Sequence, residues 1–236
     1  MGDVTVAEAA TELGVSQRHI TRLAQSGELE VVRKVGGALL IDSASVHRWA
    51  QMRRRQGRPW SEPVAWGALA LLSGHTADWL TATQRTRLKH RLRRSTAEDV
   101  AFFARRRAAP LRMRTWDATG HRIGHCIVST GVGALGTMDA ATASRFHLTT
   151  NGTTRTEGYI TVTDLDAIID DLGLTEDHNG DVTLRVVSED NPLFQGTPDT
   201  LTPPIAAIAV DLMDSLDTRE HSAGIKVLQE LIDDLR

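Results

Sequence analysis

The stretch from Val4 to Gln51 constrains the fold more than any other part of the chain, because its spacing predicts short helices separated by a tight turn. Thr5 and Glu8 have the spacing of a reciprocal capping box, in which each side chain satisfies the other residue's backbone N–H. Gly14 then ends the predicted helix, since glycine readily adopts the left-handed conformation found after a helix. The first helix is therefore expected between these two signals.

A second helix is predicted directly after this turn. Ser16 is suited to cap it, and Ile20, Leu23 and Ala24 recur at intervals of three to four residues and so share one buried stripe. Two short helices around a glycine turn predict a helix-turn-helix. Polar side chains of such a second helix can reach base edges or phosphates in the major groove of DNA. The candidate DNA-binding residues here are Ser16, Gln17, Arg18, His19, Thr21, Arg22 and Gln25.

A basic hairpin is expected next. Strand-like runs over residues 29–35 and 38–41 lie on either side of Gly36 and Gly37, a pair suited to a two-residue hairpin turn. Arg33 and Lys34 lie near the tip, where they are candidates for phosphate contact. A basic hairpin after a helix-turn-helix is a wing.

A third helix is predicted after the hairpin, with Asp42 or Ser43 as its cap. Gly57 and Pro59 break the pattern, which predicts a first domain of residues 1–58. The cations at its end are candidate phosphate contacts, although the helix dipole alone would also favour them there. These cations are Arg53, Arg54, Arg55 and Arg58.

The stretch resembles the winged helix-turn-helix of the MerR and excisionase type. The resemblance rests on the spacing of EAATELGVSQRHITRLAQSGEL and on the segment IDSASVHRW. It implies binding to double-stranded DNA. The alternative is a three-helix scaffold that binds a protein or a peptide.

Charge is divided unequally along the chain. Residues 1–115 carry 20 Lys or Arg against 10 Asp or Glu, a net charge of +10, whereas residues 116–236 carry 7 against 20, a net charge of −13. A basic first part suits a phosphate polyanion, and the acidic part is expected to face away from it. The single cysteine, Cys126, excludes an intramolecular disulfide and favours a reducing cytoplasm. We find neither a signal peptide nor an apolar run long enough for a membrane span, so no membrane partner is expected.

The remainder predicts a helical basic segment over residues 59–110 and an acidic α/β or α+β domain over residues 111–236, giving a mixed fold class overall. In the basic segment we expect a helix capped by Ser61, a basic helix over Thr83–Arg94, and a helix with a capping box of Ser95 and Glu98. In the acidic domain, Thr163 is expected to cap a helix. Strands are predicted over His125–Ser129, Val182–Val187 and Ile205–Val210.

Three patterns could indicate chemistry, and none predicts an enzyme. Gly131, Gly133 and Gly136 fit GxGxxG, with Glu157 downstream at a spacing suited to a ribose, but no clear βαβ unit surrounds them, so a glycine turn is preferred to a nucleotide site. His121, His125 and Cys126 lie close together, but a metal site needs three or four convergent ligands and the chain has no further cysteine. Asp164, Asp166, Asp170 and Asp171 fall at the start and on the solvent side of a helix, where carboxylates are expected anyway. No catalytic residues, metal or cofactor are therefore predicted.

The whole layout resembles the AbiEi-like antitoxins of type IV, abortive-infection toxin-antitoxin systems. The segments RPWSEPVAWGALALLSG, TLRVV and AVDLMDSLDTREHSAGIKVLQELIDDL carry this resemblance together with the winged helix. It implies an autorepressor that binds its own promoter, at inverted repeats, and a C-terminal domain that opposes a nucleotidyltransferase-like toxin without necessarily forming a stable complex. The alternative is a regulator whose C-terminal domain senses a small molecule.

Overall fold

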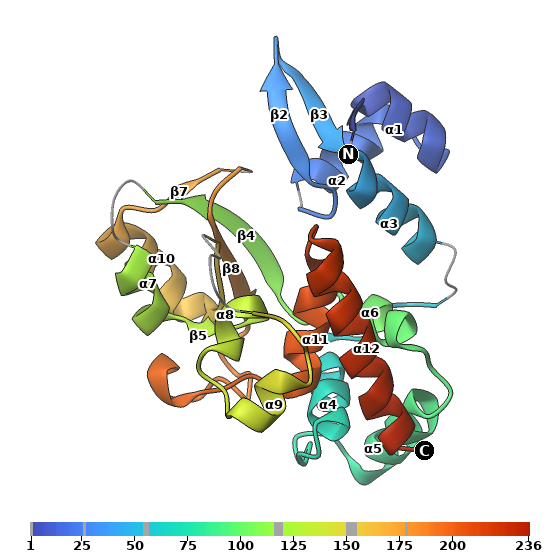
Figure 1. Ribbon diagram of the computed structural model, residues 1–236, viewed down its shortest axis with the longest axis vertical. Coiled ribbons are helices and arrows are strands. Elements are labelled where there is room, and N and C mark those ends of the chain that lie inside the picture. Colours follow the sequence, from blue (N-terminus) through green and yellow to red (C-terminus); the bar gives the residue numbers. More distant parts are fainter. Residues whose placement is uncertain (1, 26, 54–56, 116–119, 150–154, 178) are drawn as a thin grey trace.

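The computed structural model describes residues 2–25, 27–53, 57–115, 120–149, 155–177 and 179–236. A small N-terminal unit with a projecting hairpin stands above a larger body of helices and one sheet (Figure 1). The fold class is mixed, as the sequence predicts: a winged helix-turn-helix is followed by helices and an α/β arrangement. Among the described residues, no helix combines the length and the apolar character that crossing a membrane requires.

The N-terminal unit contains three helices and a three-stranded antiparallel sheet of order β1-β3-β2. Its elements are β1 (Asp3–Thr5), α1 (Val6–Leu13), α2 (Gln17–Gln25), β2 (Val31–Val35), β3 (Ala38–Asp42) and α3 (Ser43–Arg53). The small core of this unit includes Ile20 and Leu23 of α2, together with Ile41 of β3 and Val46 of α3. One short apolar stripe from each helix therefore closes the unit without help from the body.

Local signals set the boundaries of these elements. The Thr5 hydroxyl accepts the backbone N–H of Glu8 at 3.2 Å, and the Glu8 carboxylate accepts the N–H of Thr5 at 2.7 Å, so the predicted capping box is confirmed. Gly14 ends α1 with a φ of 61°. Gly36 and Gly37 have φ values of 54° and 87°, the pair of left-handed residues that a tight hairpin turn between β2 and β3 requires. Of the two caps considered for α3, Asp42 accepts the N–H of Ser45 at 2.7 Å.

The helical part of the body brings together segments that are far apart in sequence. Helices α4 (Glu62–Leu72), α5 (Ala82–Leu92) and α6 (Ala97–Ala104) share one hydrophobic core with α11 (Ile205–Asp214) and α12 (Thr218–Asp234). Gly224 of α12 allows the close approach to α11, because a Cβ there would lie 2.4 Å from the carbonyl oxygen of Ala209. Residues 59–110 thus pack directly on the C-terminal helices, while the domain boundaries at 58 and 110 stay predictions.

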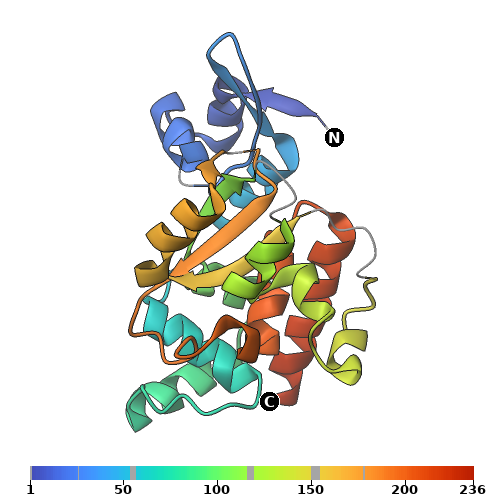
Figure 2. The same cartoon turned by 90° about the vertical axis from the view of Figure 1, so that its left-hand side faces the viewer.

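A five-stranded sheet of order β5-β6-β8-β4-β7 forms the other half of the body. Its strands are β4 (Ala109–Arg114), β5 (Val128–Ser129), β6 (Thr156–Thr161), β7 (Thr175–Glu176) and β8 (Val182–Val187). Only β6 and β8 are parallel, and α10 (Val162–Leu172) lies in the connection between them. The shorter elements are α7 (Gly120–Cys126), α8 (Gly131–Leu135), α9 (Ala140–Ser144) and the 3-10 turn Pro198–Thr200. Figure 2 shows α10 on one side of the sheet and the C-terminal helices on the other.

The predicted strand at Ile205–Val210 is wrong, because this segment forms the first part of α11. Its residues 206–210 are all buried, since α11 is surrounded by α4, α8 and α12. A short run that is apolar on every side has no periodicity to separate a buried helix from a central strand. The strand expected over His125–Ser129 forms only in part, because His125 and Cys126 belong to the end of α7 while Val128 and Ser129 pair with β6.

Two expected caps shift by one or two residues, and a third makes no capping hydrogen bond. The capping box before α6 uses Thr96 and Asp99 in place of Ser95 and Glu98. Thr161, and not Thr163, caps α10 and accepts the N–H of Asp164. Ser61 does precede α4, but its side chain makes no capping hydrogen bond. In each shifted case a neighbouring Ser or Thr competes for the same role, and the packing of the following helix decides between them.

Candidate nucleic-acid interface

Helix α2 presents a polar face outside the N-terminal core. Ile20, Leu23 and Ala24 are buried, and the opposite side of the helix leaves Gln17, Arg18 and Arg22 exposed. Gln25 is also exposed and lines the cleft described below. The structure therefore brings the predicted recognition residues together on one helix whose other face holds it in the domain.

Three of the predicted residues have roles within the domain itself. The Ser16 hydroxyl accepts the N–H of His19 at 3.3 Å, so Ser16 acts as the cap of α2. The Thr21 hydroxyl donates to the carbonyl of Gln17 at 3.1 Å, which occupies its hydrogen within the helix. His19 is half-buried, and its ring meets that of Trp49 edge-on with centroids 5.9 Å apart.

His19 also positions a cation of the exposed face. Its Nδ1 lies 2.8 Å from a terminal nitrogen of Arg22. Because Trp49 of α3 limits the movement of the imidazole, the contact restricts where the Arg22 guanidinium can point. Pre-positioning of this kind lowers the conformational entropy that an arginine loses when it binds.

The wing carries exposed cations near its tip. Arg33 and Lys34 of β2 are exposed, and the tip points away from the body (Figure 1). Arg33 forms an ion pair of 3.3 Å with Asp3 of β1, although its own side chain stays 64% exposed. The geometry thus leaves both residues accessible to a polyanion.

The arginine run after α3 is only partly covered by the structure. Arg53 is the last residue of α3, but its side chain lies outside the described parts of the structure, as do Arg54 and Arg55 altogether. Arg58 is exposed. The prediction that these residues contact phosphates stays a prediction.

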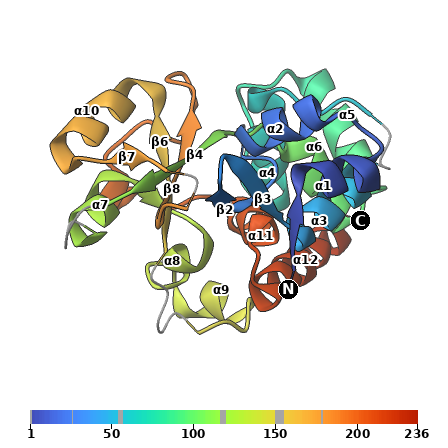
Figure 3. The same cartoon turned by 90° about the horizontal axis from the view of Figure 1, so that it is seen from above.

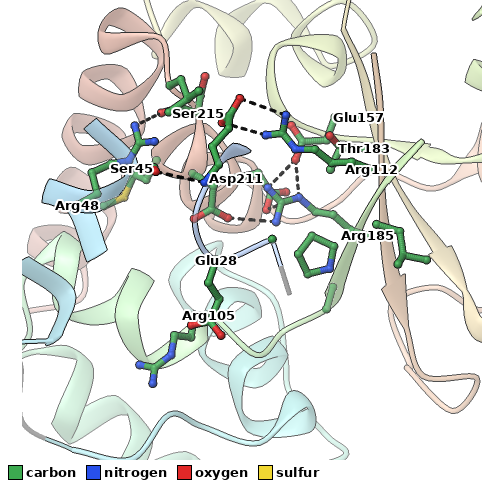
Figure 4. Close-up of a pocket in the computed structure, with 18 of the residues that line it drawn as sticks. Glu28, Ser45, Arg48, Arg105, Arg112, Glu157, Thr183, Arg185, Asp211 and Ser215 are labelled. Atoms are coloured by element: carbon green, nitrogen blue, oxygen red, sulfur yellow. Dashed lines mark hydrogen bonds and ion pairs between the residues drawn. The ribbon is translucent and has the colours of Figure 1, made fainter. Parts of the chain in front are cut away.

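The N-terminal unit is attached to the body by specific polar contacts. Arg112 of β4 donates to both carboxylate oxygens of Glu30, at 3.3 and 3.1 Å. Arg48 of α3 donates to the carbonyl of Ser215 at 2.9 Å, as Figure 4 shows. Burial lowers the pKa of Arg48 and outweighs the opposing charges of Asp42, Asp214 and Glu30. These contacts therefore hold Glu30 and Arg48 of the N-terminal unit against the body.

A cleft of about 900 Å³ lies between the N-terminal unit and the body. The C-terminal end of α2 lines one side, through Ala24 and Gln25, and strands β4 and β8 line the other. Figure 4 shows that Arg105, Glu28 and Arg185 also lie around it, so both signs of charge face the space. Movement of the winged helix against the body would open or close this cleft.

A buried ionic network forms one wall of the cleft. Asp211 of α11 is 1% exposed and accepts hydrogen bonds from Tyr159 (2.7 and 2.9 Å), Thr130 and Arg107. Arg185 of β8 lies 3.3 Å from the same carboxylate. The network thus joins the loop after α6, strands β6 and β8, and helix α11, and the polar atoms of Asp211 are fully paired.

Two further carboxylates complete this network at its solvent side. Asp214 accepts from Arg107 at 2.6 Å and from Arg185 at 3.1 Å, and Glu157 pairs with Arg185. Burial alone would raise the pKa of Asp214, but the charges of Arg107 and Arg185 lower it below its usual value. Burial raises the pKa of Glu157, with Asp211 and Asp214 adding to the rise, and the opposing charge of Arg185 does not cancel it.

The arginines and the tyrosine of the network are held in their ordinary protonation states. Burial by itself would lower the pKa of Arg107 and of Arg185, but the carboxylates around them, Asp211 above all, raise both pKa values above the usual one. Burial and the charge of Asp211 raise the pKa of Tyr159 well above its usual value. The arrangement is that of an ion cluster in which each buried charge has a partner of opposite sign.

The glycine motif is part of the same wall. Gly131 opens α8 with a φ of 59°, and a Cβ there would lie 3.0 Å from Oε2 of Glu157. Glu157, the residue with the spacing of a ribose contact, is instead paired with Arg185. The strand before the motif pairs antiparallel with β6, whereas dinucleotide sites use a parallel βαβ unit. Within the described residues, no three His, Cys, Asp or Glu side chains gather as metal ligands would.

Sequence reasoning missed the ionic network. Asp211 interrupts the apolar run IAAIAVDLM, and Arg185 lies in the strand VTLRVV; a charged residue in such a run is a signal of a buried pair. The partners could not be read from the sequence, because Arg107 and Asp211 are separated by more than a hundred residues.

The three helices, the wing and the exposed face of α2 define a DNA-binding winged helix-turn-helix domain. Comparison with known families agrees: residues 4–54 match the family described as a helix-turn-helix domain. None of the curated proteins or solved structures compared with the chain matches it. The predicted DNA-binding helix-turn-helix is thus confirmed, and a domain of this class is typical of DNA-binding regulators.

Proposed function

We propose that the protein is a transcriptional autorepressor and an antitoxin, whose winged helix binds its own promoter and whose acidic C-terminal domain, residues 111–236, opposes a nucleotidyltransferase-like toxin encoded beside it. The observation that carries the repressor part is the exposed face of α2, with Arg18 and Arg22 accessible beside an accessible wing. Repression follows from such binding when the site overlaps the protein's own promoter.

The antitoxin part rests on the resemblance to AbiEi-like proteins and on charge. Residues 116–236 carry a net charge of −13, a field that repels DNA and attracts a basic protein. A protein that handles nucleotides or RNA presents such a basic surface. No catalytic role is proposed for this body, and its action on the toxin takes place in the cytoplasm.

The repressor part is tested with a labelled fragment of the protein's own promoter. Arg18→Ala/Arg22→Ala should weaken binding by about 1 to 3 kcal/mol per lost base contact. Both side chains are exposed, so thermal unfolding should shift little. The control is Arg122→Ala, an exposed arginine of α7 in the body. Equal affinity of the wild type and the double variant at matched salt would show that α2 does not recognise DNA through these two arginines.

The antitoxin part is tested by growth rescue, because a type IV antitoxin need not bind its toxin stably. The full chain and the Arg18→Ala/Arg22→Ala variant are each co-expressed with the neighbouring gene product from a promoter that the protein does not control. Both should restore growth, since the body is intact in each. If neither restores growth, the antitoxin role is wrong, while the repressor role is unaffected.

A second candidate function is ligand sensing, which the cleft between the winged helix and the body favours. A small molecule bound there would contact α2 and the body together, so its binding would change the orientation of the winged helix. Nucleotides and metabolites can be screened by thermal shift, because a ligand at 100 times its Kd adds about 2.7 kcal/mol of stability. A ligand that shifts unfolding and also changes promoter affinity would establish sensing.

A further inference from the structure

Helix α5 carries positive charge without acidic neighbours in sequence. Between Trp79 and Ala97 the chain contains no Asp or Glu, yet it holds six arginines and lysines up to Arg94: Arg85, Arg87, Lys89, Arg91, Arg93 and Arg94. Leu88 and Leu92 alone bury the helix against the body. The packing of α5 against the body does not account for this number of positively charged residues.

The cations of α5 fall into two groups with different surroundings. On one side, Arg85 donates to the carbonyl of Leu80 at 2.8 Å, and Arg93 donates to the carbonyl of Leu235 at 2.8 Å. These two side chains hold the fold together. On the other side, Arg87 and Arg94 are exposed, and within the described parts of the chain their side chains form no hydrogen bond or ion pair.

The second group forms one continuous surface. His90 and Arg91 lie three and four residues after Arg87 and so share one face of α5 with it, and Arg94 follows in the turn after the helix, three residues beyond Arg91. They line a hollow of about 500 Å³, together with Asp99 and Phe103 of α6. We call these four basic residues the α5 surface.

The hollow is held open by stacking. The Arg91 guanidinium lies 3.9 Å from the centre of the Phe103 ring and 5.7 Å from that of Trp60. Its flat face is thus fixed, while its side chain stays exposed. The Asp99 carboxylate accepts the N–H of Thr96 at 3.1 Å and belongs to the cap of α6. Arg91 is therefore held in place between the exposed side chains of Arg87 and Arg94.

The residues just before α4 also lie beside this surface. Gly57 lies against Arg91 and Phe103, since a Cβ there would be 3.5 Å from Nη2 of Arg91. The next residue, Arg58, is exposed. Helices α2 and α5 lie on the same side of the molecule when it is viewed along the long axis (Figure 3), separated along that axis (Figure 2).

We propose that the α5 surface binds the phosphate backbone of double-stranded DNA next to the site that α2 reads. DNA presents a negative charge about every 1.7 Å of its axis, so a row of exposed arginines, of which Arg87 and Arg94 form no ion pair within the described residues, matches it. A protein partner fits less well, because protein interfaces have an apolar centre, and the aromatic rings here, Trp60 and Phe103, are only 7% exposed. The proposal rests on the DNA-binding role of the N-terminal domain and extends it to the body.

The proposal is tested with promoter duplexes of two lengths, one trimmed to the footprint of the winged helix and one extended by about 20 base pairs, or two helical turns, on each side. Full-length wild type should bind the long duplex more tightly. Arg87→Gln/Arg94→Gln should lose this gain and lower the slope of log K against log salt by about 0.9 per phosphate contact. Binding to the short duplex should not change.

The matched control is Lys89→Gln/Lys226→Gln, which removes the same two charges from exposed side chains outside the α5 surface. It should keep the gain with length. An extended duplex of unrelated sequence should show the same loss for Arg87→Gln/Arg94→Gln, because phosphate contacts carry no sequence information. The duplex of unrelated sequence tests the α5 surface even if the promoter is not the target. The α5 proposal and the repressor proposal can therefore fail independently. An unchanged slope on both long duplexes, or an equal loss in the control, would overturn the proposal.

Discussion

Arg112 of β4 and Glu30, the residue before β2, face each other across the cleft and form two hydrogen bonds of 3.3 and 3.1 Å. Glu30 is 15% exposed and Arg112 is 29% exposed, so water screens this pair less than a surface pair. Asn179, with its amide oriented to satisfy both of its groups, adds donations to the carbonyls of Val31 and Val32 at 2.7 and 3.1 Å. The wing is therefore bonded at its base to the body.

The first prediction is that this pair couples the winged helix to the body. Glu30→Gln, Arg112→Gln and the double variant form a cycle, and the coupling energy should be about 1 kcal/mol, the upper part of the range for partly exposed pairs. Denaturant unfolding followed by circular dichroism measures it. The pair of Arg114 and Asp177, both about a third or more exposed, is the control and should couple less. Additive single effects for Glu30 and Arg112 would mean that the contact does not hold the units together.

The second prediction concerns the centre of the body. Asp211→Asn should destabilise the protein by about 3 to 5 kcal/mol, because it removes a negative charge that compensates the buried positive charges of Arg107 and Arg185. Urea unfolding provides the measurement. Asp166→Asn, an exposed carboxylate of α10, should change stability by no more than about 0.5 kcal/mol. Equal small effects at both positions would show that the network adds little to stability.

The third prediction is a pH dependence set by Glu157, whose pKa is raised in the folded protein. Between the unfolded pKa and the raised folded pKa, the folded state binds a proton at Glu157 that the unfolded state does not. Linkage then requires stability to fall as pH rises through this window. Wild type should therefore gain stability relative to Glu157→Gln as pH is lowered from neutral toward about 4.5, near the ordinary value of a glutamate.

The Glu157 comparison is made by measuring unfolding of both proteins at matched ionic strength. Asp214 acts in the opposite sense: its pKa is lowered, so its contribution is lost only as pH falls below the usual aspartate range. The change with pH in the stability difference between wild type and Glu157→Gln should consequently fall above that range, between about 4.5 and the raised pKa of Glu157. A difference that does not vary with pH would contradict the raised pKa of Glu157.

The fourth prediction is that His19 acts on DNA through Arg22. His19→Ala should weaken promoter binding, because the Arg22 guanidinium loses its contact of 2.8 Å and with it a restricted orientation. In an Arg22→Ala background the same change should have little effect. A double-mutant cycle in a promoter titration measures this, with an expected coupling of about 0.5 to 1.5 kcal/mol for one hydrogen bond. Additive effects would instead indicate that His19 contacts DNA itself.

The sequence by itself determined the N-terminal domain, because each of its boundaries depends on a few neighbouring residues. A cap at Thr5, a left-handed glycine at Gly14 and the pair Gly36 and Gly37 act through local hydrogen bonds and backbone angles. The stripe of Ile20 and Leu23 then fixes which face of α2 is buried, and so which side chains are left for DNA. Such short-range signals can be recognised in the sequence without knowing the rest of the fold.

Only the tertiary structure decided the body. Ile205–Asp214 is a helix because other helices surround it, which a uniformly apolar run cannot indicate. The network around Asp211 joins residues from 107 to 214, and the contact between Glu30 and Arg112 bridges the two units. Such pairs depend on where distant segments meet in space. A charged residue within an apolar run indicates that it has a partner of opposite charge. Only the tertiary structure determines which residue that partner is.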